Sequence, residues 1–110
     1  MRLPYGNRAE LGTKLEDYVL NPHHREGRHK ARRFESVLGV TLANTGVLRQ
    51  AILSAAENSE DAEPFGNNGH GEVYVLRFPL KTEKGSATVL SAWIVQNGED
   101  FPRLVTCYIV

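Results

Sequence analysis

The stretch EVYVLRFPLKTEKGSATVLSAWIV, residues 72–95, decides the fold class. Two runs rich in β-branched and aromatic residues flank KTEKG, which is short enough to join them as an antiparallel hairpin. A third run of this kind, RLVTCYIV at 103–110, follows QNGEDFP. The sequence therefore predicts three antiparallel strands. Because Pro79 has no backbone N–H, we expect the outer edge of the first strand to be unpaired there.

Helical periodicity replaces this pattern in the first half of the chain. The spacing of apolar residues predicts one helix over residues 12–20, a second over 26–38, and a third that Thr41 or Asn44 can cap. Gly39 is placed to be the left-handed residue after the second helix. The residues expected to form the buried face of that helix are Ala31, Phe34, Val37 and Leu38.

Helices followed by strands indicate an α+β fold. Residues 57–71 carry charge, Pro and Gly without a period, so they are expected to form a long exposed connection between the two halves. We expect three N-terminal helices packed on a small antiparallel β-sheet that the C-terminal half forms. A chain of 110 residues suits a single domain, residues 1–110.

Charge and cysteine content narrow the function classes. The 13 Lys and Arg residues balance the 13 Asp and Glu residues, so the chain as a whole has no field that attracts nucleic acid or an anionic membrane. Basic residues nevertheless concentrate at 25–33 and acidic ones at 57–63. Cys107 alone permits neither an internal disulfide nor a cysteine metal site. With no apolar signal segment and no run long enough to span a membrane, we expect a soluble, cytoplasmic protein.

The stretch NPHHREGRHKARRF, residues 21–34, holds three of the four histidines. His23 and His24 follow Pro22 in the turn before the second helix, and imidazole exchanges protons near neutral pH. The alternative for each of them is an exposed loop residue that has no chemical role. The spacing of the histidines fits no standard metal site, so we expect neither a metal nor a cofactor.

Lys30 lies close to the apolar face of the predicted second helix, one turn before Phe34. Two interpretations stay open. The lysine stem can cover apolar surface while its ammonium reaches solvent. Alternatively, the ammonium is held at the edge of a cleft, where it can neutralise phosphate charge in a transition state. The residues that lie on the opposite side of this helix are Arg28, His29, Arg32 and Arg33.

Strict alternation in the last strand separates two faces. Leu104, Thr106, Tyr108 and Val110 are expected on one face, and Val105, Cys107 and Ile109 on the other. If the helices cover the Cys107 face, Thr106 and Tyr108 point out of the sheet near Arg103, a combination that suits phosphate binding. Polar residues on the solvent face of a sheet explain the same pattern. Trp93 is expected either to pack in the core or, if exposed, to stack on a base.

Three stretches of the chain resemble a family of small, uncharacterised bacterial domains. They are LPYGNRAEL, KLEDYVLNPHHREGRHKARRFESVLG and SAWIVQNGEDFPRLVTCYIV, and together they span nearly the whole chain. Members of that family occur alone and as C-terminal modules of polymorphic toxins and phage-related proteins. They are similar to the superfamily of metal-independent ribonucleases that includes barnase, EndoU-type nucleases, colicin tRNases and RelE-type toxins.

The resemblance implies a toxin-type endoribonuclease in which the ribose 2′-OH attacks the adjacent phosphorus. It implies His24 as general acid and base, Lys30 and Arg103 as a phosphate clamp, and Thr106 with Tyr108 as a hydroxyl pair that orients the phosphate. The family usually has an acidic residue and a proline beside its central histidine, whereas this chain has His23 and Arg25, so His23 can share or take over that role.

RNA is then the expected substrate, and a small antitoxin or immunity protein encoded next to the chain is the expected partner. The residues expected to bind RNA are Arg25, Arg28, His29, Arg32, Arg33 and Trp93. The alternative is a non-catalytic module that binds a protein or a nucleic acid through the basic helix 25–33.

Overall fold

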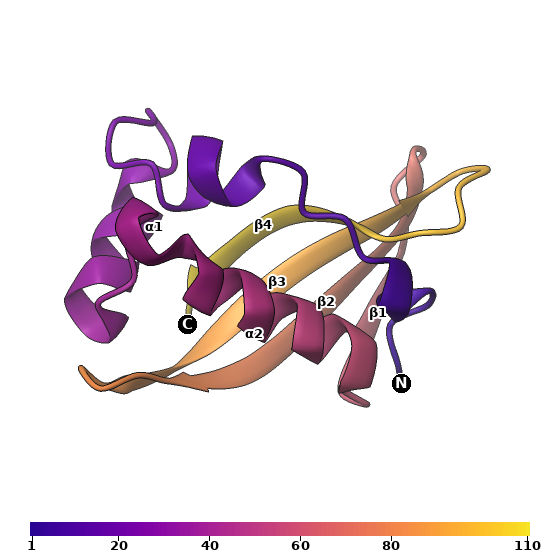
Figure 1. Cartoon of the computed structure of the whole chain (residues 1–110). Coiled ribbons are helices and arrows are strands. Elements are labelled where there is room, and N and C mark those ends of the chain that lie inside the picture. Colours follow the sequence, from indigo (N-terminus) through magenta and orange to yellow (C-terminus); the bar gives the residue numbers. More distant parts are fainter.

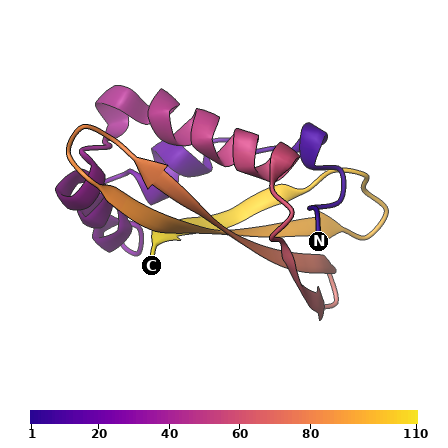
Figure 2. The same ribbon diagram turned by 90° about the horizontal axis from the view of Figure 1, so that it is seen from below.

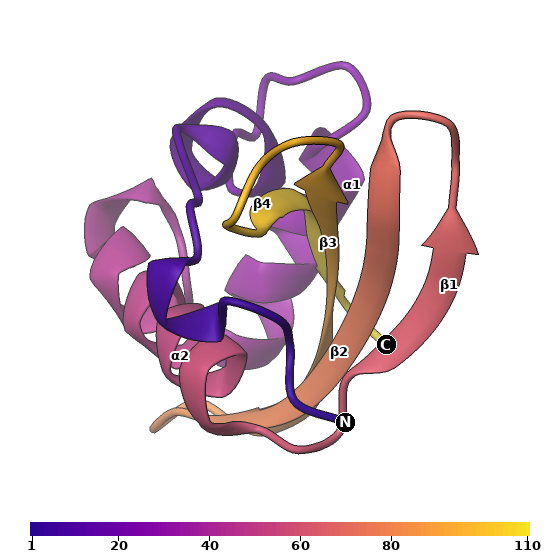
Figure 3. The same cartoon turned by 90° about the vertical axis from the view of Figure 1, so that its right-hand side faces the viewer.

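Four antiparallel strands form a single sheet in the order β1-β2-β3-β4 in the computed structural model, which describes residues 1–110. The strands are β1 (Glu63–Asn67), β2 (Gly71–Lys81), β3 (Ser86–Gln96) and β4 (Arg103–Ile109). Helix α2 (Thr45–Asn58) lies across one face of this twisted sheet (Figures 1 and 2). The other face is left without a covering helix over β1 and β2, which lie on the right in Figure 3.

The three predicted strands are confirmed as β2, β3 and β4, but β1 was not predicted. It lies within the region expected to be an exposed connection, and all five of its residues are exposed. A change of register between Pro64 and Gly66 interrupts its pairing with β2, so no period of two marks it in the sequence. β1 pairs with β2 only at Glu72 to Val75, which leaves the outer edge at Pro79 unpaired, as predicted.

The prediction of three N-terminal helices is wrong. The helices lie in the middle of the chain, over residues 28–58, and only short elements precede them. These are the 3-10 turn η1 (Gly6–Arg8) and the five-residue π-helical turn η2 (Leu15–Val19). Gly12, which has a φ of 54°, and Pro22 bound the segment around η2, so the apolar spacing there produces one turn rather than a helix.

The second predicted helix is confirmed. Helix α1 (Arg28–Arg33) continues directly into the π-helical segment η3 (Phe34–Leu38). It ends at Gly39, whose φ of 69° is the predicted left-handed conformation. A capping box at Thr41 then opens η4 (Leu42–Asn44), and α2 follows.

The core lies between α1, η3, α2 and the covered face of the sheet. Phe34 and Trp93 are both fully buried there, and Ala31 and Leu38 face inward beside Phe34, as predicted. The Trp93 indole N–H donates to the Ser91 hydroxyl (2.9 Å), which donates to the carbonyl oxygen of Leu76 (2.9 Å). This short chain satisfies the polar atoms that β3 carries into the core.

A bulge in β4 corrects the predicted faces of that strand. Thr106 pairs with Ala92 and Leu104 pairs with Trp93, so Val105 is one residue in excess. The extra residue reverses the alternation, and Leu104 is buried on the same side as Cys107 instead of sharing a face with Thr106. None of the helices has the length and apolar composition needed to span a membrane.

Candidate functional site

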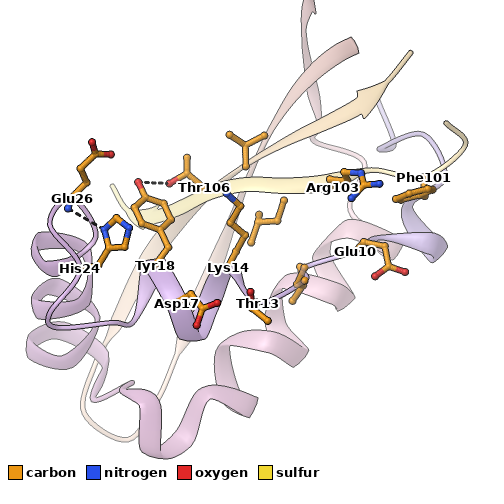
Figure 4. A pocket seen from close by; sticks show the side chains of 14 residues that line it. Glu10, Thr13, Lys14, Asp17, Tyr18, His24, Glu26, Phe101, Arg103 and Thr106 are labelled. Carbon is orange, nitrogen blue, oxygen red and sulfur yellow. Dashed lines mark hydrogen bonds between the residues drawn. The ribbon is translucent and has the colours of Figure 1, made fainter. Parts of the chain in front are cut away.

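An open cleft of about 1000 Å³ lies along the outer edge of β4. Its walls come from the segment that contains η2, from the turn before α1 and from the beginning of β4 (Figure 4). Its polar lining includes Glu10, Thr13, Lys14, Asp17, Tyr18, His24, Glu26, Arg103 and Thr106. The fold thus brings His24 of the turn at residues 22–24 together with the beginning of the last strand.

Tyr18 and Thr106 meet at one end of this cleft (Figure 4). The Thr106 hydroxyl donates to the Tyr18 phenol oxygen at 3.5 Å. The Lys30 ammonium lies 5.0 Å from the centre of the Tyr18 ring and 5.9 Å from that of Tyr108. Lys30 therefore points toward the sheet, as predicted, and its side chain stands beside the cleft. It forms no salt bridge with any carboxylate.

The electrostatics of this cluster act on Tyr18. The pKa of the Tyr18 phenol is lowered below that of an ordinary tyrosine, first by the hydrogen-bonding influence of the Lys30 ammonium and then by the Thr106 hydroxyl. Partial burial and the Glu26 carboxylate act in the opposite direction without reversing the shift. The Tyr18 phenol therefore loses its proton more readily than the phenol of a tyrosine in water.

His24 is held in one tautomer by the backbone. Its Nδ1 accepts the N–H groups of Glu26 (3.0 Å) and Gly27 (2.9 Å), so the proton of the neutral ring resides on Nε2. The imidazole packs edge-on against Tyr18, with ring centres 4.8 Å apart. In this state His24 is a hydrogen-bond donor through Nε2–H, and Nδ1 has no free lone pair to take a proton from a substrate.

Asn21, three residues before His24, stabilises the turn that carries this histidine. The Asn21 side-chain oxygen accepts the N–H of His23 (2.9 Å), and its backbone oxygen accepts that of His24 (3.3 Å). His23 is exposed and does not line the cleft. Of the two histidines left open by the sequence, His24 is the one at the site.

Arg103 lies at the other end of the cleft, away from Tyr18 and Thr106 (Figure 4). Its guanidinium donates twice to the Glu99 carboxylate, at 2.8 and 2.7 Å, and stacks on the Phe101 ring at 4.8 Å. The hydrogen bonds to Glu99 raise the pKa of Arg103. The structure therefore does not join Arg103 with Lys30 in one phosphate clamp, because Glu99 already occupies the guanidinium.

The basic residues of 25–33 spread over the surface around α1. Arg25, His29, Arg32 and Arg33 are exposed, and none of the arginines forms an ion pair. Arg28 is half-buried and donates to the backbone oxygen of Arg25 at 2.7 Å. Arg32 lines a separate small hollow beside Pro22 and Thr41. This surface adjoins the cleft without forming part of its wall.

Trp93, a predicted site residue, and Cys107, the single thiol of the chain, both lie in the core. Trp93 has no exposed surface, so the expectation that it stacks on a base is wrong. Its indole is needed to fill the space between the sheet and the helices. Cys107 is also buried, and burial raises the pKa of its thiol to about 12, which makes it a poor nucleophile.

Tyr18 is the site residue that sequence reasoning missed. Its spacing with Leu15 and Val19 marks it as part of an apolar helical face, and one tyrosine in such a face carries no sign of a chemical role. In the structure Tyr18 is half-buried and lines the cleft. Thr106 and Lys30, which meet it there, are distant in the sequence.

Comparison with known proteins assigns the chain to a family. A family model described as a domain of unknown function, DUF6883, matches residues 2–110. The chain belongs to this family. No curated protein and no solved structure matches it. The DUF6883 match covers every residue of the cleft, from Glu10 to Thr106, and membership specifies no activity.

Proposed function

We propose that this DUF6883 chain is an endoribonuclease that cleaves RNA without a metal, through attack of a ribose 2′-OH on the adjacent phosphorus. One observation carries the proposal: the Lys30 ammonium, which has no carboxylate partner, lies 5.0 Å from the centre of the Tyr18 ring, and the phenol oxygen of that ring meets the Thr106 hydroxyl at the end of an open cleft. A free cation next to hydrogen-bonding hydroxyl groups suits a phosphodiester. The resemblance to toxin ribonucleases supports the same chemistry.

The residues at the site have different roles in the proposed reaction. Lys30 offsets the negative charge that develops on the phosphoryl oxygens in the transition state. The Nε2–H of His24 donates a hydrogen bond that orients the phosphate, whereas the Thr106 hydroxyl donates to the Tyr18 phenol oxygen. A neutral histidine that acts as a donor rather than as a base has precedent in other enzymes.

The biological setting belongs to the proposal as well. The family resemblance favours a toxin of a bacterial toxin–antitoxin or toxin–immunity pair that acts on RNA in the cytoplasm. Such a toxin needs a small neutralising protein. The exposed arginines around α1, which have no internal partners, suit an acidic surface on that protein.

The test is cleavage of a short RNA by the purified chain in the presence of EDTA. A single ribose placed in an otherwise deoxyribose strand directs cleavage to that position, because only a ribose has the attacking 2′-OH. Ends that carry a cyclic phosphate or a 3′-phosphate are the expected products. An all-deoxyribose strand of the same sequence is the matched control, and cleavage of that strand contradicts the proposed chemistry.

A second candidate function has its own observation. The exposed cations of 25–33 lie outside the cleft, so they can bind a nucleic acid or an acidic protein whether or not the cleft is catalytic. RNA binding without any cleavage, weakened by changes at Arg28 or Arg32, favours this non-catalytic module.

A further inference from the structure

We propose that the phenolate of Tyr18, and not a histidine, accepts the proton of the attacking 2′-OH, and that Lys30 supplies the proton to the leaving oxygen. This inference rests on the proposed ribonuclease function and assigns its proton transfers. The cleft requires such an assignment because the lone pair of His24 Nδ1 is already used by two backbone N–H groups.

The arguments against His24 as the base are geometric. A proton on Nδ1 would meet the N–H groups of Glu26 and Gly27, at 3.0 and 2.9 Å, and both hydrogen bonds would be lost. Nε2 already carries the proton of the neutral ring. His23 is exposed and outside the cleft wall, so it is not placed to replace His24.

The arguments for Tyr18 come from three elements that meet around its side chain. η2 supplies the phenol itself, β4 supplies the Thr106 hydroxyl that donates to it at 3.5 Å, and α1 supplies the Lys30 ammonium 5.0 Å from the ring centre. Both neighbours stabilise a negative oxygen. This arrangement also lowers the pKa of the phenol, with Lys30 as the largest cause.

The other charged groups around Tyr18 are few. Lys14, on the segment just before η2, places its ammonium 5.9 Å from the ring centre. Glu26, in the turn before α1, opposes ionisation. The neutral His24 ring contacts the edge of Tyr18. The carboxylates of Asp17 and Glu10 also line the cleft, so it is Lys30, and not an excess of cations, that favours the phenolate.

The proposed step balances in protons and electrons. The O–H bond of the 2′-hydroxyl breaks as its proton moves to the Tyr18 phenolate, and the O2′–P bond forms. The P–O5′ bond breaks, and the departing oxygen takes a proton from the Lys30 ammonium. Transfer of a proton from the Tyr18 phenol to the Lys30 amine then restores the starting pair, and a cyclic phosphate is the product.

The test compares wild type with Tyr18→Phe, which removes a single oxygen and keeps the ring that packs on His24. We expect cleavage of the ribose-containing strand to fall by about 10²–10⁴-fold while RNA affinity is preserved. Tyr5→Phe is the control, because Tyr5 is exposed and does not line the cleft. Cleavage by Tyr18→Phe at the wild-type rate overturns the inference and leaves the ribonuclease proposal intact. A wild-type chain that cleaves no RNA overturns both.

A second measurement separates proton transfer from a structural role and does not depend on Phe at this position. A fluorinated tyrosine at position 18 makes the phenol more acidic, so the rise of the cleavage rate with pH is expected at lower pH than in wild type. The fluorine NMR signal of this residue reports the ionisation of the same phenol without substrate, because the other three tyrosines carry no fluorine. A rate profile that stays in place while the phenol ionises at lower pH rules out Tyr18 as the base.

Discussion

Gly27 lies directly against the backbone of Tyr18. A Cβ atom on Gly27 would stand 2.0 Å from the Tyr18 carbonyl oxygen and 2.9 Å from Cδ1 of its ring. The φ of Gly27 is −76°, so it is the close approach, and not the conformation, that requires glycine here. This contact fastens the turn that carries His24 to the turn that carries Tyr18.

Gly27→Ala is therefore expected to force the two turns apart. We expect a loss of about 1–3 kcal/mol in the free energy of unfolding, as for an overpacked site, together with reduced cleavage. Chemical denaturation measures the first and the RNA assay the second. Gly46→Ala is the matched control, because nothing lies within 4 Å of a Cβ added there and alanine favours the helix α2. Equal stability of wild type and Gly27→Ala would mean that the turns are not held by this contact.

Lys30→Met removes the largest cause of the lowered Tyr18 pKa. The pKa of the phenol then rises, so the pH at which the phenolate forms, and with it the rise of the cleavage rate, moves upward. Lys30→Arg keeps a positive charge and is expected to retain most of the lowered pKa. A pH–rate profile measures both variants, and Lys81→Met, at the exposed end of β2, controls for the loss of a lysine. An unchanged profile in Lys30→Met is the contrary result.

Ser91→Ala breaks the buried chain that satisfies the Trp93 indole N–H. The N–H is left without a partner in the core, which is expected to cost about 1–3 kcal/mol of stability. Urea unfolding followed by Trp93 fluorescence measures the loss. Ser54→Ala on the exposed face of α2 is expected to change stability by less than about 0.5 kcal/mol. Similar effects of the two substitutions would argue against a structural role for this chain of hydrogen bonds.

Arg28→Gln and Arg32→Gln are expected to weaken RNA binding for all sequences alike, because contacts with phosphates carry little sequence information. Each lost contact is expected to reduce the slope of log affinity against log salt by about 0.7 for single-stranded RNA. Titrations at several salt concentrations check this. Arg77→Gln is the control, since Arg77 is on β2 and paired with Glu63. If neither Arg28→Gln nor Arg32→Gln changes the slope, RNA binds elsewhere on the surface.

Much of the fold could be predicted because it depends on local patterns. The three long strands follow from runs of β-branched and aromatic residues, and the helix over 28–38 follows from the spacing of Ala31, Phe34 and Leu38. The left-handed Gly39 ends that helix in the way a glycine at such a position predicts. Lys30 was placed toward the sheet by the same helical spacing.

The sequence by itself determined the α+β class, the three long strands and the side of α1 on which Lys30 lies, since each follows from a period that neighbouring residues set. Tertiary structure alone decided that Leu15–Val19 forms one turn, that Glu63–Asn67 joins the sheet, and that a bulge at Val105 buries Leu104. It also decided the site. Tyr18, Lys30 and Thr106 become neighbours only through the packing of η2 and α1 on β4, because contacts between residues far apart in sequence leave no local period to detect.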